Sequence, residues 1–67
     1  MNYVVIELQT NSEGQTANLV YAYGDLAQAM SKYHSILAAA AVSSVACHAA
    51  LVIDQSGVGV ARESFEH

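Results

Sequence analysis

One helical segment, lying between two pairs of strand-like segments, constrains the fold of this chain more than any other feature. Asp25 follows Gly24 and precedes Gln28 by three residues, a capping-box pattern that is typical of a helix start. The apolar residues that follow recur at helical spacing; they are Leu26, Ala29, Met30, Tyr33, Ile36, Leu37, Ala40 and Ala41. The sequence therefore predicts a helix from Asp25 to about Ser43.

Four further segments are rich in strand-forming residues and are separated by polar turn chemistry. Asn11–Gly14 joins the first two segments, and Asp54–Gly57 joins the last two. The element order predicts an α+β protein of ββαββ type, with the helix on one face of a four-stranded antiparallel sheet, as a single domain over residues 1–67. The predicted strands are residues 3–10, 17–23, 45–53 and 58–65.

The composition predicts that this domain works as a homo-oligomer. A chain of 67 residues is near the lower limit for a self-sufficient core, and its only cysteine, Cys47, allows no internal disulfide. Charged residues make up only 12%, against roughly a quarter in ordinary soluble domains. Both faces of several predicted strands are apolar, so we expect a second subunit to cover the face that the helix leaves free. We expect a lysine at Val5 or Val52 to dissociate the oligomer if these residues lie in that interface.

The charge balance and the hydropathy exclude two classes of partner. Six carboxylates and only two cations, Lys32 and Arg62, give a net charge of −4, so we expect no nucleic-acid binding. The longest apolar run, residues 36–42, is far short of the ~20 residues that span a bilayer, and no basic segment followed by an apolar run opens the chain. We therefore expect no membrane partner and a cytoplasmic location.

The reactive side chains do not form a recognisable catalytic or metal-binding pattern. Cys47 and His48 are neighbours in a predicted strand, so their side chains point to opposite faces and cannot act as a pair. The other histidines, His34 and His67, show no ligand spacing. Gly57–Gly59 opens no helix and is therefore not a dinucleotide loop. We expect no enzymatic activity, no metal and no cofactor.

The polar cluster around Lys32 is the candidate ligand site. Lys32 and His34 are separated by roughly 200° around the helix, so one subunit cannot easily aim both at the same atom. Across an oligomer interface, Lys32 of one chain and His34 or Arg62 of another could converge on an anion, while Tyr21 and Tyr23 stack on a planar ring. The alternative is structural: Lys32 is then a solvated charge, His34 a boundary residue, and the tyrosines are part of the core.

Four stretches together span most of the chain and carry a resemblance; they are YVVIELQT (3–10), NLVYAYGDL (18–26), KYHSILAAAAVSS (32–44) and HAALVIDQSG (48–57). They resemble a group of short proteins of phages and prophages of gut-associated bacteria, in which no motif has an assigned role, so the resemblance transfers no site residue. It implies a phage context, and therefore the cytoplasm of the host cell. In that context tiny oligomeric proteins either sequester nucleotides of host immune signalling or serve in virion assembly.

Two functions from different classes are consistent with these features. The first is a non-enzymatic, homo-oligomeric binding protein, a phage-encoded sponge that counters host defence by sequestering a small anionic nucleotide signal. The second is a structural or assembly protein that acts through self-association. A ligand response favours the first function, and a large assembly without a ligand response favours the second.

Overall fold

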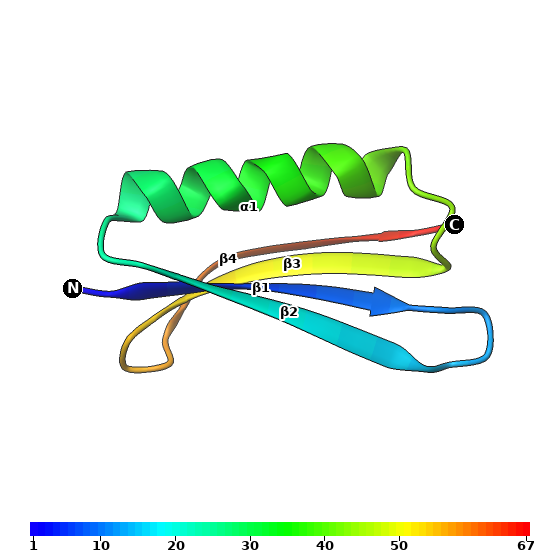
Figure 1. The fold of residues 1–67 in the computed structure, drawn as a ribbon, viewed down its shortest axis with the longest axis horizontal. Coiled ribbons are helices and arrows are strands. Elements are labelled where there is room, and N and C mark those ends of the chain that lie inside the picture. Colours follow the sequence, from blue (N-terminus) through cyan, green and yellow to red (C-terminus); the bar gives the residue numbers. More distant parts are fainter.

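The computed structural model describes residues 1–67 and shows four strands and one helix in the predicted ββαββ order. The sheet has the strand order β2-β1-β3-β4, and all neighbouring strands are antiparallel. The helix lies along one face of this sheet (Figure 1). The elements are β1 (Tyr3–Thr10), β2 (Thr16–Tyr23), α1 (Leu26–Ala41), β3 (Cys47–Asp54) and β4 (Gly59–Glu66).

The two hairpins close with the same turn chemistry. In the first, Asn11 Oδ1 accepts hydrogen bonds from the backbone N–H groups two and four residues later, at 2.9 and 3.0 Å. In the second, Asp54 Oδ1 does the same at 2.8 and 3.0 Å. Each turn then needs a residue at positive φ, and glycine supplies it: Gly14 at 83° and Gly57 at 85°. Local side-chain chemistry thus sets both hairpins, as the sequence predicted.

The start of α1 agrees with the predicted cap. Asp25 is the N-cap, and its side chain accepts a hydrogen bond of 3.0 Å from the backbone N–H of Ala27. Gln28 makes no return bond to Asp25, so only half of the predicted capping box forms. Its side chain instead lines a hollow beside the helix, described below.

The end of α1 comes earlier than predicted. The helix ends at Ala41, and Ser43 Oγ accepts a 3.0 Å hydrogen bond from the backbone N–H of Val45. This local turn competes with further helical bonding. It also delays the next strand, which begins at Cys47 rather than at Val45.

The core is the contact between α1 and the central strands. Val5 of β1 and Val52 of β3 are completely buried beneath Tyr33 and Ile36 of the helix, which are 5% and 4% exposed. Burial, with a smaller contribution from the carboxylate of Glu63, raises the pKa of Tyr33 above its ordinary value. The phenol therefore stays neutral at physiological pH.

The condition for the predicted dissociation by lysine is not met, because Val5 and Val52 lie in the core of the subunit. Both are fully buried under the helix, and a lysine at either position would disrupt the core rather than a contact between subunits. The helix covers the sheet face that carries these two valines, and no element covers the other face (Figure 1). We call that other side the open face; on the central strands it consists of Val4, Ile6, Leu8, Thr10, Cys47, Ala49, Leu51 and Ile53.

Removing the side chain of Ile36 tests this description of the core. We expect Ile36→Ala to lower the free energy of unfolding by about 3 kcal/mol, because it leaves a cavity between α1 and the sheet. Val42→Ala is the matched control: Val42 is 86% exposed, so its truncation should change stability by less than about 0.5 kcal/mol. Urea denaturation followed by circular dichroism measures both changes, and equal effects would contradict this assignment of the core.

Candidate functional site

Lys32 lies where the helix α1 faces the edge strand β2. Its Nζ is 4.2 Å from the centre of the Tyr21 ring, which is cation–π geometry. The lysine and the tyrosine are both half-buried. Contact with the ring restricts a side chain that is otherwise among the most mobile. The ammonium group is therefore held at one place on the surface.

A shallow hollow of about 470 Å³ lies beside this ammonium group. Lys32 is the only charged residue in its lining, and each of the other side chains carries a hydrogen-bonding group. We call it the Lys32 hollow; its lining residues are Tyr23, Gln28, Ser31, Lys32 and Ser35. The four helical residues form two i, i+4 pairs, which places them on one side of α1.

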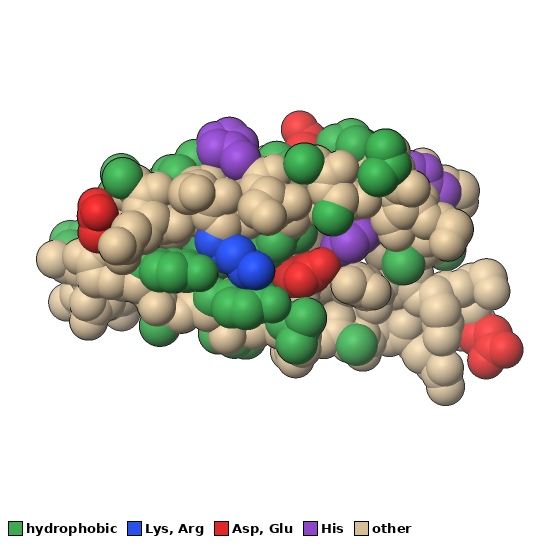
Figure 2. Space-filling model, turned by 45° about the horizontal axis from the view of Figure 1, so that its top comes forward, with side chains coloured by type: hydrophobic (Ala, Val, Ile, Leu, Met, Phe, Trp, Pro, Cys, Tyr) green, Lys and Arg blue, Asp and Glu red, His purple; other side chains and the backbone are tan.

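An acidic side chain lies on the sheet near Lys32 without lining the hollow. Figure 2 shows a single basic side chain on this side of the molecule, next to apolar side chains and an acidic one. The charge of Lys32 contributes to lowering the pKa of Glu7. Glu7 lines a separate hollow of about 200 Å³ near β2, together with Gln9, Ala17, Asn18 and Leu19.

The structure brings together three of the five predicted ligand-binding residues: Lys32, Tyr21 and Tyr23. His34 is exposed on the other flank of α1, where its ring meets that of Tyr33 edge-on at 5.3 Å. Within one chain, Lys32 and His34 therefore do not share a ligand, as the helical spacing indicated.

Arg62 is also separate from Lys32. It follows Ala61, which packs against the core, so the alternation of side chains along β4 places Arg62 on the open face of the sheet. The sheet itself thus lies between the two cations of the chain. Arg62 can join Lys32 at one ligand only if it comes from another subunit.

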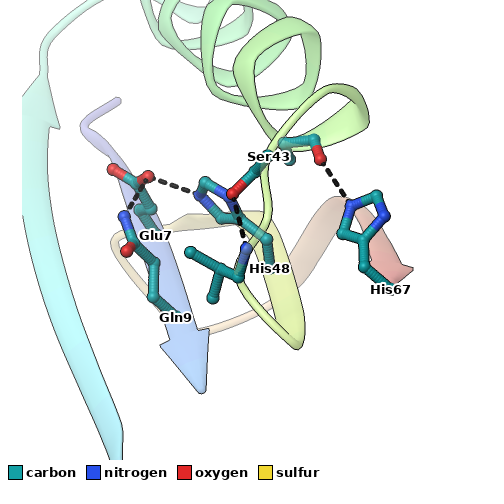
Figure 3. Close-up of polar contacts among 7 residues, drawn as sticks. Glu7, Gln9, Ser43, His48 and His67 are labelled. Carbon is teal, nitrogen blue, oxygen red and sulfur yellow. Dashed lines mark hydrogen bonds and ion pairs between the residues drawn. The ribbon is translucent and has the colours of Figure 1, made fainter. Parts of the chain in front are cut away.

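A buried hydrogen-bonded pair beneath the helix was not predicted. His48 of β3 is 4% exposed, and its Nε2 lies 2.6 Å from Glu7 Oε2 of β1. Gln9 Nε2 donates a second hydrogen bond of 3.0 Å to the same carboxylate oxygen. Figure 3 shows the three side chains converging from two neighbouring strands. Because an ionised carboxylate only accepts, His48 Nε2 carries the proton in this contact.

The pKa of Glu7 reflects competing influences. Burial would raise it, but hydrogen bonds from His48 and Gln9, together with the nearby charges of His48 and Lys32, lower the pKa below its ordinary value. The carboxyl group is therefore ionised at neutral pH. The ionised carboxylate of Glu7 on β1 bonds to His48 on β3 and so links the two central strands.

This pair resembles the base-orienting pairs of catalytic sites, but its remaining nitrogen is not accessible. His48 Nδ1 is buried and has no hydrogen-bond partner, so a substrate cannot reach it. One signal in the sequence points to the pair: Glu7 and His48 each lie two residues from a core position, Val5 and Ala50, and so share its face of the strand. The register that places them together, in which Gln9 faces His48, depends on long-range pairing.

The other reactive groups do not assemble into a site. His67 Nε2 lies 2.9 Å from the carbonyl oxygen of Ala40, near the end of α1 (Figure 3). No three side chains among the histidines, cysteine and acids are close enough to hold a metal ion. The single helix is too short and not apolar enough to cross a membrane.

Comparisons with protein-family models, with curated proteins and with solved structures found no match for this chain. The site is therefore interpreted from its own geometry.

The pair of Glu7 and His48 predicts an acid-sensitive fold. Because the pKa of Glu7 is lower in the folded state than in the unfolded state, the stability that its charge contributes is fully present above the unfolded pKa, near 4.3. That contribution is lost as the pH falls through the lower, folded pKa. We expect Glu7→Gln to cost about 1 kcal/mol at neutral pH and to lose less stability on acidification than the wild type. Urea unfolding at about pH 7 and about pH 3 measures this; parallel losses in the two proteins would exclude the pair as the cause.

Proposed function

We propose that this protein is a non-enzymatic binding protein that captures a small anionic molecule of the nucleotide class in the Lys32 hollow. One observation carries the proposal. The only lysine of the chain is held against the Tyr21 ring at the edge of a hollow whose other lining side chains are uncharged and can form hydrogen bonds.

The lining suits the parts of a nucleotide. An ammonium group and serine hydroxyls bind phosphate oxygens, and charge-assisted hydrogen bonds of this kind are stronger than neutral ones. The side chains of Ser31 and Ser35 lie one helical turn apart on the same side of α1 as Lys32. Tyr23 offers an aromatic ring for a base, and Gln28 offers an amide for its polar edge. A single cation suits a ligand with one or two phosphate charges.

The biological role that we propose is sequestration. The resemblance to short phage proteins supports a phage-encoded sponge that lowers the free concentration of a nucleotide immune signal in the host cytoplasm, with the protein acting as a homo-oligomer. His34 and Arg62 are not needed for capture by one chain. His34, on the same side of the sheet as Lys32, is a candidate for a contact made across a subunit interface, whereas Arg62 lies on the other side of the sheet.

A second candidate function is assembly, in which self-association is itself the role. The apolar open face of the sheet favours this function, because it offers a large surface for another copy. The two candidates differ in their response to ligand, since assembly alone requires none.

Removing the charge of Lys32 tests the proposed capture. We expect Lys32→Met to weaken the binding of a cyclic dinucleotide or ADP-ribose by roughly 10- to 100-fold, the value of one charge-assisted contact. Arg62→Met is the matched control: it removes the same charge from the other side of the sheet and should leave affinity within about twofold. Thermal-shift screening identifies the responding nucleotide, and calorimetry measures its affinity. Equal loss in both variants would contradict the Lys32 hollow as the site, and no response of the wild type to any nucleotide would favour assembly.

A further inference from the structure

The open face of the sheet is more apolar than the face that the helix covers. Every isoleucine and leucine of the central strands β1 and β3 lies on the open face; these are Ile6, Leu8, Leu51 and Ile53. The covered face carries Glu7, Ala50 and His48 in the same strands. In a protein that works as a monomer the larger apolar side chains belong under the helix, because burial there removes most apolar surface from water.

Charge is nearly absent from this face. None of its residues on the central strands is charged, and the two charged residues, Arg62 and Glu66, lie on the edge strand β4. At the other edge, Val20 of β2 is 60% exposed. The pattern of an apolar centre with a polar rim is typical of protein interfaces.

The open face is not flat. A hollow of about 260 Å³ surrounds the small side chain of Ala49, with Leu8, Leu51 and Arg62 in its lining. The two leucine side chains project beside the small alanine, so one copy can place a leucine in the hollow of the other.

The area of the face reaches what a specific contact requires. Four strands at about 4.8 Å spacing and eight residues at about 3.3 Å per residue give a footprint of roughly 500 Å². Two such faces together bury roughly 1,000 Å², which is the lower limit of the size expected of a specific interface.

We propose that a second copy of this chain packs its open face against this one, forming a two-sheet sandwich with the helices on the outside. The Lys32 hollow lies on the opposite side of the sheet, so this inference does not depend on ligand capture. Two-fold symmetry makes the contact self-complementary, because each copy supplies the same surface.

The position of Arg62 selects the orientation of the two copies. The strand registers place Val20, Ile6, Leu51 and Arg62 in one row across the middle of the open face. A two-fold axis that runs across the strands stacks β4 on β4 and brings the two Arg62 side chains together, which is unfavourable. An axis that runs along the strands stacks β4 on β2 of the partner subunit. Arg62 then lies at the rim over Val20 of the partner subunit and can reach water.

The polar residues at one end of the face support the same orientation. Ser64 and Asn18 occupy the two ends of the next row on the open face. Glu66 and Thr16 occupy the two ends of the row after that. An axis along the strands places each of these polar side chains over the polar side chain at the other end of its row. The apolar centre then meets only apolar side chains.

Sedimentation equilibrium of three proteins tests the interface. We expect the wild type to be a dimer at micromolar concentration and Leu51→Lys to be a folded monomer, because a charge at the centre of the contact is left unpaired. Val42→Lys is the matched control: it adds the same charge at an apolar position that is 86% exposed at the end of α1, and it should remain a dimer. A monomeric wild type, or a Leu51→Lys variant that keeps its fold by circular dichroism and still dimerises, would overturn the proposal.

Cysteine cross-linking tests the orientation without placing a charge in the interface. In a Cys47→Ser background, Asn18→Cys and Ser64→Cys keep Arg62 in place and occupy opposite ends of one row, three strand spacings or roughly 14 Å apart within one copy. Facing sheets are about 10 Å apart, so we expect a thiol-specific cross-linker of about that length to join the double variant rapidly into a covalent dimer and Ser64→Cys alone slowly. Rapid linkage of the Ser64→Cys single variant would show the crossed orientation, and no linkage in either variant would count against the face-to-face contact.

Discussion

The packing of one helix on one face of a four-stranded sheet is the constraint from which the other features follow. Tyr33 and Ile36 bury Val5 and Val52 on the central strands, and this contact supplies most of a small core. A single helix is too narrow to cover all four strands, so the Lys32 hollow remains beside β2, where Lys32 contacts Tyr21. The single helix also leaves the second face of the sheet uncovered. A candidate ligand site and a candidate interface thus arise on opposite sides of the same sheet.

The elements were predictable because their signals are local. Asp25 caps the helix through its own first turn, and Asn11 and Asp54 close the hairpins with bonds to residues two and four positions later. The face that the helix covers was not predictable in this way, because both faces of β1 and β3 are apolar enough to form a core. The choice depends on long-range pairing, in which Glu7 and His48 form a hydrogen bond beneath the helix. That pairing permits the less apolar face to be the buried one.

The candidate site was likewise predictable only where its features are local. Helical spacing separates Lys32 from His34, and the structure agrees. The contact of Lys32 with Tyr21 depends on where β2 lies beside α1, which no local pattern specifies. The placement of Arg62 required the strand pairing of β4, since a shift of one residue would move it to the side of the helix. Features that need only a few neighbouring residues were therefore predictable, and features that need two distant strands were not.

The central claim is that this fold is completed by a second copy on its open face. The most direct test is the midpoint of thermal unfolding as a function of protein concentration, because association of folded chains stabilises them by mass action. We expect the midpoint to rise steadily over roughly a hundredfold increase in concentration. A midpoint that stays constant over this range, with reversible unfolding, would show that the single chain is stable alone and would contradict the claim.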